Sequence, residues 1–545
     1  MESDAAVLIV GAGPAGATLA NLLATYGISA LLIDKELDVL DYPRAVGIDD
    51  EALRTIDTFE LADLAMTDMV CNTPVRYYSS AGHCFAHVKP SARPFGFPRR
   101  NNFLQPMLER RLRTALEGHE GIEIVLGCEL VSFTQDADGV TAELLLSSGD
   151  RRTVRTTFLI GADGGKSTVR SLAGIALDGT THATKWLVVD VRNDTWDAPY
   201  AAVYCDPVSP SMVIALPFQH RRFEFRLDDV IDEGAATADE AVMARLQRFY
   251  RDLPLPELVR ARVYQHHSRV ATRFSTGRVY LVGDAAHLQP PFFGQGMNSG
   301  FRDVFNLGWK LAATLDGAVG PSVLASYDTE RRSHAAAMVS FATRIGKLYS
   351  PRSRGTERVR DAFFKAVTHL PGARDYILQM KYKPMPNYEG GLVLAPGSKG
   401  TPIGRMLAQP TVERLDGSRL RLDKALGAGF SILGIHRDPG PSLSAASRAQ
   451  LDRLGARLLE VRVPRDVALE HRDAPAAASK GVDVIADTDG AFEEMLLARP
   501  DEEVLIIRPD RYVAAACRAT ELDATVAALA RLLEIPVAGG GSSDR

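Results

Sequence analysis

The chain has 545 residues, a formal net charge of -5 and 46% hydrophobic residues. This length exceeds the size at which one hydrophobic core stops growing, so we expect two or three domains. The weakly acidic balance lacks the basic footprint of a nucleic-acid-binding protein, and no nucleic-acid partner is expected.

The five cysteines are scattered without a CxxC pair, a distribution typical of a reducing compartment and without metal-ligand spacing, so we expect no metal site. The first residues carry neither the basic region of a signal peptide nor an unbroken apolar run. The expected protein is therefore cytoplasmic and not associated with a membrane.

The first motif lies between two short apolar runs at residues 7–10 and 30–33. Between them, the segment GAGPAG at 11–16 precedes a helical pattern, so this part of the chain reads as a βαβ unit and predicts an α/β fold with a parallel, Rossmann-like sheet. The segment matches the dinucleotide fingerprint, in which glycines permit a tight turn and close approach of the backbone to a pyrophosphate. A tight structural turn is the alternative. The predicted cofactor-binding residues here are Gly11, Gly13, Pro14, Ala15 and Gly16.

An acid ends the second apolar run. Asp34 follows Gly16 by 18 residues, close to the spacing of about 20 expected for a carboxylate that accepts the ribose hydroxyls. A carboxylate there repels a 2′-phosphate, which favours the adenosine of FAD or NAD over that of NADP. Asp34 and its neighbour Lys35 are therefore predicted to lie at the adenosine end of the site.

A second motif begins with the strand-like run at 280–282 and continues through a loop rich in proline and glycine. Asp284 is placed to accept a hydrogen bond from a ribityl hydroxyl, and amides that open the following helix would stabilise negative charge on a flavin. The alternative is a glycine-rich loop with one capping acid. The predicted cofactor-binding residues of this motif are Gly283, Asp284, Pro291, Gly294, Gly296, Met297 and Asn298.

A third segment, at 158–170, is again strand, acid-glycine turn and helix start. Asp163 and Gly164 form the turn, and Arg170 is a candidate partner for a phosphate or carboxylate. Asp163 could equally be an ordinary helix cap, because Asp and Ser favour helix starts for local reasons.

The pattern along the chain predicts a divided first domain. We expect an FAD-binding domain in two parts (1–180 and 271–392, the second with helices), with an antiparallel-sheet substrate domain inserted at 181–270. Glycine and proline accumulate at 386–410, and we place a linker at 392–410 that leads to a separate small α/β domain at 411–537. The polar tail at 538–545 is expected to be disordered.

Together, GAGPAG with Asp34, the DG segment at Asp163 and the GD segment at Asp284 resemble the single-component (class A) FAD-dependent aromatic hydroxylases, the p-hydroxybenzoate hydroxylase fold. The stretches PRAVGIDDEALR and RRFEF look most like the subgroup of 3-(3-hydroxyphenyl)propionate hydroxylases and phenol hydroxylase-like enzymes. The C-terminal domain is similar to the thioredoxin-like domain of that subgroup, but Cys517 is its only cysteine, which excludes a dithiol redox role. The resemblance also places Arg44 and Gln105 at flavin-contacting positions, although Arg44 could be a surface ion pair.

The resemblance implies an NAD(P)H-dependent monooxygenase of the EC 1.14.13 type that hydroxylates a phenolic substrate with O2 through a flavin C4a-hydroperoxide. NADPH or NADH would visit transiently, since no second fingerprint follows, and a homodimer is possible. Pro290 and Pro291 would shape the reaction site. Candidates in the inserted sheet for activating the phenol are His266, His267, Tyr204 and Arg226.

Two alternatives stay open at this stage. The same scaffold could serve as a tailoring hydroxylase or Baeyer-Villiger monooxygenase of a polyketide or other secondary metabolite. It could also be a flavin-binding sensor or resistance protein without monooxygenase turnover.

Overall fold

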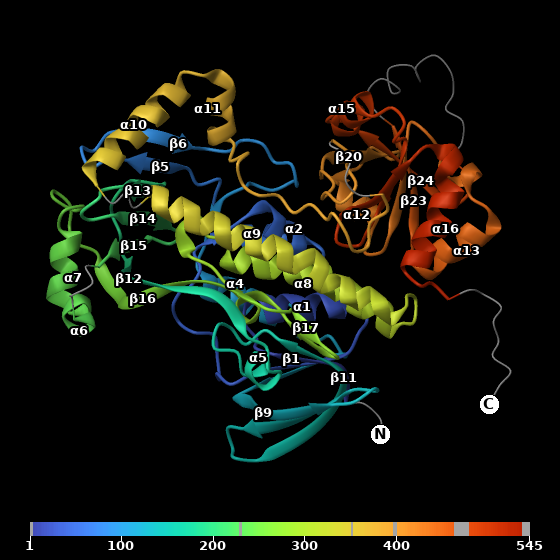
Figure 1. The fold of residues 1–545 in the computed structure, drawn as a ribbon, viewed down its shortest axis with the longest axis horizontal. Helices are drawn as coiled ribbons and strands as arrows, with labels where there is room; N and C mark the ends of the chain where they lie inside the picture. The colour runs from blue at the N-terminus through green and yellow to red at the C-terminus, as the bar shows by residue number, and fades with distance from the viewer. Residues whose placement is uncertain (1–3, 228–231, 350–352, 396–399, 463–478, 537–545) are drawn as a thin grey trace.

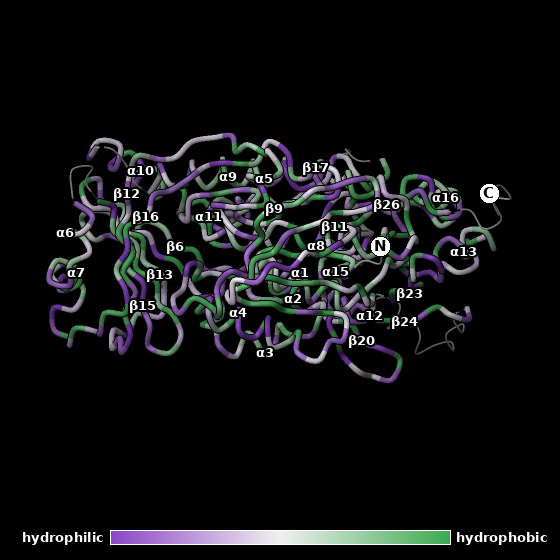
Figure 2. Tube along the Cα trace, turned by 90° about the horizontal axis from the view of Figure 1, so that it is seen from below, coloured by the Kyte–Doolittle hydropathy of each residue, from purple (hydrophilic) through white to green (hydrophobic). Residues whose placement is uncertain are grey.

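The computed structural model describes residues 4–227, 232–349, 353–395, 400–462 and 479–536, and the tail predicted at 538–545 lies outside them. The described residues form a mixed α/β fold with several sheets (Figure 1). Seen from below, the molecule is elongated, with the sheet that contains β12–β16 at one end and the C-terminal sheet at the other (Figure 2). Within these ranges, none of the helices has the length and apolar character needed to cross a bilayer.

The first sheet builds the parallel core. Its main path runs β17-β18-β11-β1-β2-β8, with β1 parallel to both β11 and β2, and β9 and β10 extend it as a meander. Because β1 is covered on both faces, nearly all of its side chains are buried and apolar. The strands are β1 (Ala5–Val10), β2 (Ala30–Asp34), β8 (Ile122–Leu126), β9 (Cys128–Gln135), β10 (Val140–Leu146), β11 (Arg151–Gly161), β17 (Ser275–Thr276) and β18 (Val279–Leu281).

The second sheet has the order β19-β16-β12-β15-β14-β13-β5-β6 and is mostly antiparallel. It extends beyond the residues predicted for the substrate domain, because β5 and β6 come from the first 100 residues and β5 pairs in parallel with β13. Such a pairing across more than 100 residues leaves no local signal in the sequence. The strands are β5 (Val75–Tyr78), β6 (Cys84–Val88), β12 (Leu177–Arg192), β13 (Ala201–Tyr204), β14 (Ser211–Leu216), β15 (His220–Arg226), β16 (Glu257–Ala271) and β19 (His287–Leu288).

Two long helices, α8 (Gly296–Leu315) and α9 (Ser326–Tyr349), cross the middle of the molecule between these sheets (Figure 1). A three-stranded sheet, β3-β7-β4, closes one side of the same region. The shorter elements here are α1 (Pro14–Thr25), β3 (Gly47–Ile48), α2 (Asp50–Asp57), α3 (Ala62–Met66), β4 (Val70–Cys71), β7 (Asn101–Asn102), α4 (Gln105–Thr114), α5 (Thr168–Leu172), α6 (Glu233–Thr237), α7 (Asp239–Leu246), η1 (Gly283–Ala285), η2 (Pro291–Phe293), η3 (Pro321–Ala325), α10 (Arg354–Thr368) and α11 (Pro371–Leu378).

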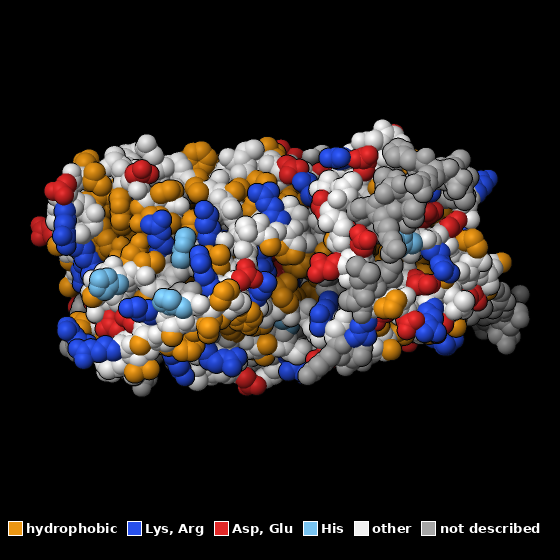
Figure 3. All heavy atoms as spheres, turned by 90° about the horizontal axis from the view of Figure 1, so that it is seen from above, with side chains coloured by type: hydrophobic (Ala, Val, Ile, Leu, Met, Phe, Trp, Pro, Cys, Tyr) orange, Lys and Arg blue, Asp and Glu red, His pale blue; other side chains and the backbone are white. Residues whose placement is uncertain are grey.

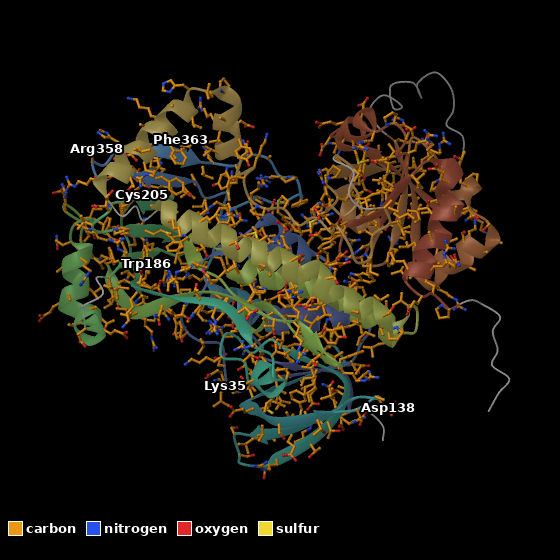
Figure 4. The ribbon with its side chains drawn as sticks, viewed as in Figure 1. Lys35, Asp138, Trp186, Cys205, Arg358 and Phe363 are labelled. Atoms are coloured by element: carbon orange, nitrogen blue, oxygen red, sulfur yellow. The ribbon has the colours of Figure 1, made fainter. Side chains whose placement is uncertain are left out.

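Helix α10 carries large apolar side chains on its outer surface. Val359 and Phe363 are 72% and 60% exposed, and Phe363 is labelled on this helix in Figure 4. In the space-filling view from above, apolar side chains gather on the half of the molecule where Figure 1 places α10 (Figure 3).

The C-terminal sheet has the order β21-β20-β24-β23-β22-β25-β26. It is docked on the first part of the chain by a shared apolar cluster in which the ring of Trp309 on α8 meets that of Phe430 edge-on at 5.5 Å. Its elements are β20 (Thr411–Arg414), β21 (Arg419–Arg421), α12 (Leu422–Leu426), β22 (Ser431–Ile435), η4 (Gly440–Ser442), α13 (Ala445–Arg453), β23 (Arg457–Arg462), β24 (Val482–Asp487), α15 (Ala491–Ala498), β25 (Val504–Ile507), β26 (Val513–Cys517), η5 (Ala519–Glu521) and α16 (Leu522–Leu532).

Candidate functional site

The glycine-rich turn after β1 is packed too closely for side chains. Gly11 has φ +107°, and a Cβ there would lie 2.5 Å from the carbonyl oxygen of Ala162, whereas a Cβ on Gly16 would lie 1.9 Å from that of Gly11. Gly13, by contrast, has only the Arg44 guanidinium within 4 Å, at 3.8 Å. The turn thus exposes its backbone at Gly13 to the space in front of α1, as binding of a pyrophosphate requires.

Asp34 ends β2 beside this turn. Its carboxylate accepts hydrogen bonds from the backbone N–H of Ala12 at 2.8 Å and from that of Glu36 at 2.9 Å. Each carboxylate oxygen keeps a free lone pair, because an ionised carboxylate offers about four acceptor positions. Asp34 therefore both fixes the turn and remains able to accept from a ribose.

The second motif forms the loop from β18 through η2 to α8. Gly283 and Gly300 approach so closely that a Cβ on Gly300 would lie 3.2 Å from the Gly283 Cα, which brings α8 directly against the loop. Asp284 accepts no hydrogen bond from the described residues and is exposed towards the cavity described below. The backbone N–H groups of Gly296, Met297 and Asn298 open α8, so they have no acceptor within the helix.

A buried ionic group behind this loop escaped the sequence analysis. Asp303 on α8 accepts hydrogen bonds from the backbone N–H of Gly283 at 3.0 Å, from His287 Nε2 at 2.7 Å and from Arg331 Nε at 3.0 Å. His287 and Arg331 lower the pKa of Asp303 despite its burial. This carboxylate holds the turn that carries Asp284, a role that no spacing along the chain indicates.

The third motif lies between the cavity and the start of α5. Asp163 borders the cavity, and its carboxylate also accepts from Ser167 Oγ at 2.5 Å and from the backbone N–H of Val169 at 3.1 Å, so it caps α5. Gly164 forms the turn with φ +78°. Arg170 lies behind the turn and donates to the carbonyls of Ala285 and Gly165, both at 2.9 Å, so its guanidinium ties the second motif to the third.

These three motifs surround one cavity of about 490 Å³ that reaches from the first sheet to the second. At one end it is bordered by Gly11, Gly13 and Asp34, and at the other by side chains of β14, β15 and η2. Figure 4 labels Lys35 at the end of β2 and Trp186 on β12, whose ring packs edge-on against Phe292 of η2. The predicted cofactor-binding residues on its lining are Gly11, Gly13, Pro14, Ala15, Asp34, Lys35, Arg44, Gln105, Asp163, Gly164, Gly283, Asp284, Pro291, Gly294, Gly296, Met297 and Asn298.

Arg44 and Gln105 both border the cavity, on the loop that follows β2 and at the start of α4. Gln105 accepts from the backbone N–H of Ala45 and donates to Glu109, both at 2.5 Å, so it fixes the loop that carries Arg44. The Arg44 side chain is 50% exposed and stands 4.0 Å from Glu109. From the other side, Arg222 on β15 donates to the carbonyls of Pro43 and Arg44, which binds this loop to the second sheet.

The candidates for phenol activation do not border this cavity. His266 stacks on Trp186 and meets Phe292 edge-on at 5.1 Å, and burial lowers its pKa to about 4. Tyr204 stacks on Tyr78 at 5.3 Å, and Arg226 donates to the carbonyl of Pro207 at 2.7 Å.

His267 and the two prolines complete the set of predicted catalytic residues. His267 bonds Thr181 at 2.9 Å on the side of the sheet formed by β12 and β16. Pro290 is buried directly before η2, and Pro291 begins η2 on the cavity wall. Pro291 therefore lines the cavity and Pro290 only precedes it in the chain, whereas His267, like the other three candidates, stands outside the lining.

An acidic cluster at the start of α2 was also missed. Asp49, Asp50 and Glu51 come within metal-binding distance of one another, but Arg302 and Lys383 supply compensating cations. Arg302 and Lys383 lower the pKa of Glu51 against the effect of its burial. Burial, opposed by Lys383 and aided by Asp49 and Glu51, raises the pKa of Asp50 to about 6. In the sequence these acids look like an ordinary helix N-terminus.

The donor and acceptor groups around the cavity fit FAD. The glycine turn open at Gly13 and the carboxylate of Asp34 would suit the ADP half, Asp284 would suit the ribityl chain, and the amides at the start of α8 would suit a ring whose negative charge increases on reduction. These features define an FAD-dependent oxidoreductase.

Comparison with known proteins identifies the family. Residues 4–342 match the FAD binding domain family, and residues 404–532 match the HcaD C-terminal domain. The chain belongs to the family of FAD-dependent aromatic monooxygenases.

The curated relatives extend this assignment along the whole chain. A 3-(3-hydroxy-phenyl)propionate/3-hydroxycinnamic acid hydroxylase of Burkholderia vietnamiensis is 44% identical, covering 96% of this chain and 95% of its own. A hydroxylase with the same name from Mycobacterium sp. strain JLS is 40% identical, covering 99% of this chain and 94% of its own. Both relatives therefore share the C-terminal domain as well as the flavin domain.

Solved structures resemble the fold over the same extent. The flavin-dependent monooxygenase PieE, in complex with FAD and substrate, has a TM-score of 0.80 at 25% identity and covers 98% of this chain and 100% of its own. Aklavinone-11 hydroxylase, in complex with FAD and aklavinone, has a TM-score of 0.76 at 25% identity with the same coverage.

Proposed function

We propose that this enzyme hydroxylates a phenol that carries a carboxylate side chain, with 3-(3-hydroxyphenyl)propionate and 3-hydroxycinnamic acid as its substrates and NAD(P)H and O2 as co-substrates. The observation that carries the proposal is the 44% identity over 96% of the chain to a hydroxylase named for these two acids. FAD, when bound, supplies the chemistry that activates dioxygen.

The residues of the chain have separate tasks in this proposal. Gly13 and Asp34 hold the ADP half of FAD, and Asp284 with the amides of Met297 and Asn298 holds its ribityl and ring portions. The apolar side chains Met212, Ile214 and Phe292 form the wall at the opposite end of the cavity and exclude water from the reacting ring. The cavity holds the substrate in one orientation, so the reacting groups need not meet by diffusion in solution.

The experiment is turnover by purified, FAD-loaded enzyme with a panel of phenols. We expect 3-(3-hydroxyphenyl)propionate and 3-hydroxycinnamate to accelerate NAD(P)H oxidation, with one atom of ¹⁸O from labelled dioxygen in the product. Acceleration only by polyketide phenols would contradict the proposal and favour a tailoring enzyme, including a Baeyer-Villiger type. No acceleration by any phenol would favour a flavin-binding sensor or resistance protein.

Several further expectations stay proposals. The order β23-β22-β25-β26, with β22 and β23 parallel and the other pairs antiparallel, supports a thioredoxin-like C-terminal domain. The boundaries 1–180, 181–270, 271–392 and 411–537 can be tested by limited proteolysis. A homodimer can be tested by the molar mass in solution, and the need for NAD(P)H supports the cytoplasm as the compartment.

A further inference from the structure

The second sheet forms one wall of the cavity, and its side chains alternate between the cavity and the apolar core. On β15, Arg222 and Glu224 point to the cavity, as do their register partners Ile214 and Met212 on β14. The intervening residue Phe223 and its partner on β14 pack into the apolar core on the opposite face. Alternation along the strands therefore places one carboxylate, Glu224, on an otherwise apolar and cationic wall.

Glu224 differs from the other charged groups of this wall in having no partner among the described residues. The residue is only 6% exposed, and no donor in the described part of the chain bonds its carboxylate. Its oxygens are nevertheless not sealed in the protein, since they border the cavity. Arg222 is occupied by two hydrogen bonds to Asp190, at 2.7 and 3.0 Å, and by the loop at Pro43.

The other acids at this end of the cavity are engaged elsewhere. Asp49 and Glu51 accept from Arg302 and Lys383. Asp50 stands 3.6 Å from Arg99, and its Oδ2 is sealed without a hydrogen-bond partner. Glu224 is thus the acid of this wall whose oxygens are open to a ligand.

We propose, building on the function proposed above, that Glu224 is the catalytic base that takes the proton of the substrate phenol. The phenolic O–H bond breaks, a new O–H bond forms on a carboxylate oxygen of Glu224, and the electron pair stays on the phenolate. This pair increases the electron density of the ring carbons ortho and para to the oxygen, which are the positions that an electrophilic oxygen attacks.

The surroundings of Glu224 suit this task. Burial raises the pKa of Glu224, Arg222 on the same strand lowers it and Asp190 on β12 raises it, so the net pKa lies above the usual value. A base works best when its pKa is close to the operating pH, and a carboxylate raised in this way accepts a phenolic proton more readily than an exposed one.

The first test follows the protonation state of the bound phenol. Holoenzyme is titrated with 3-(3-hydroxyphenyl)propionate, and the phenolate absorbance is recorded against pH. We expect the wild type to bind phenolate well below the free phenol pKa of about 10, and Glu224→Gln to bind neutral phenol there. The kcat of Glu224→Gln should fall about 10²-fold near neutral pH and recover as the pH approaches that of free phenol ionisation.

The controls separate this role from a structural one. Glu257→Gln, at the rim of the same sheet where Glu257 pairs with Arg192, should keep the wild-type profile. The methyl ether of the substrate has no proton to lose, so it should bind equally well to wild type and Glu224→Gln. An unchanged phenolate signal in Glu224→Gln, or a signal lost only in Asp50→Asn, would overturn the assignment. Failure of the wild type to turn over the phenol would instead refute the function proposed above.

A different observation points to the residue at the other end of the substrate. Arg100 borders the cavity, forms no ion pair in the described part of the chain, and its Nε is buried without a hydrogen-bond partner. Its neighbour Arg99, in contrast, pairs with Asp50 and donates to the carbonyl of Gln379 at 2.6 Å. Asn102 donates to the carbonyl of Ala215 at 2.7 Å, which holds this segment against the end of β14.

We infer that Arg100 binds the substrate carboxylate. A guanidinium binds a carboxylate through two parallel hydrogen bonds, and such charged bonds contribute strongly when partly buried. Glu224 would repel a carboxylate, so the two residues give the substrate one orientation, with its phenol at β15 and its acid at Arg100.

The second test removes either the guanidinium of the protein or the carboxylate of the ligand. Arg100→Gln should raise the Kd of 3-(3-hydroxyphenyl)propionate at least about tenfold, measured by the absorbance change of bound flavin. The same variant should bind 3-ethylphenol, which lacks the carboxylate, as tightly as the wild type does. The control Arg110→Gln changes an exposed pair with Asp41 and should alter neither value. An equal loss for both ligands would overturn the role of Arg100.

Discussion

Charged side chains gather in two regions of this enzyme, and the two regions differ in how these charges are paired. Between the C-terminal domain and α8–α9, Arg508 donates to Glu330 at 2.7 and 2.8 Å and to Asp510 at 2.6 Å, and Lys310 donates to Glu330 at 2.7 Å. These four side chains are at most 1% exposed. In the cavity, Asp284, Glu224 and Arg100 have hydrogen-bonding capacity that no described residue uses.

The difference separates docking from recognition. In a closed network every charged group bonds another group of the protein, and these bonds offset the cost of removing the charges from water. Such a network also specifies one relative position of two domains. An open charge has no protein partner, so a ligand can supply one. We therefore read the interface at Arg508 as structural support for α8, whose first turn borders the flavin cavity, and the cavity charges as contacts for ligands.

The largest expected effect comes from breaking the closed network. Arg508→Ala leaves Glu330 and Asp510 buried without their main cation, and removing one partner of a buried ion pair costs about 3–5 kcal/mol. We expect a marked fall in Tm and faster proteolytic release of the C-terminal domain.

The control for this experiment is Arg518→Ala. The Arg518–Asp501 pair lies in the same domain but is exposed, so its loss should change stability by less than about 1 kcal/mol. Equal effects of the two variants would contradict the structural role of the buried network at Arg508.

The second prediction concerns an open charge. Asp284→Ala removes the acceptor proposed for the ribityl chain, and a hydrogen bond to a charged group contributes about 1.5–3 kcal/mol. The Kd for FAD, followed by quenching of its fluorescence on binding, should rise roughly tenfold or more. Tm of the protein without FAD should stay close to that of the wild type, because no described residue bonds this carboxylate. A large loss of stability in the FAD-free protein would show that Asp284 belongs with the closed networks.

The sequence could predict the parts of the site that lie within short segments. The turns at Gly11 and Asp163 each lie between a strand and a helix that are close in the chain, and the turn at Gly283 directly follows β18, so local patterns predicted all three. Asp34 could be found because its spacing from the turn is fixed by a single βαβ unit.

The parts that were missed depend on partners far apart in the chain. Glu224 lies within the quoted stretch RRFEF, yet its exposure to the cavity follows only from the register of β14 with β15. Arg508 meets Glu330 across 178 residues. His266 looked like a base because histidine titrates near neutral pH, but its burial on Trp186 lowers its pKa to about 4.

The smallest effect is expected at Asp50, where the cavity meets the acidic cluster. The pKa of Asp50 is about 6 in the folded protein and 3.8 as its ordinary value, so the native state binds more protons than the unfolded state between these values. The free energy of unfolding therefore falls as pH rises from about 4 to 6. Above that range Asp50 is fully ionised in the folded protein, and the destabilisation by its buried charge no longer increases. Asp50→Asn removes the charge and should stabilise the protein at pH 8 by on the order of 1–2 kcal/mol.

The matched control is the next residue. The pKa of Glu51 is lowered because Arg302 and Lys383 outweigh its burial, so its charge stabilises the fold above its ordinary pKa and this contribution is lost on acidification. Glu51→Gln should therefore lower Tm at pH 8, whereas Asp50→Asn should raise it, with the gain disappearing towards pH 4. Substitution of two neighbouring acids on one helix would then change Tm in opposite directions, because cations surround Glu51 more completely than Asp50. A fall in Tm at pH 8 for both variants would place Asp50 among the paired charges.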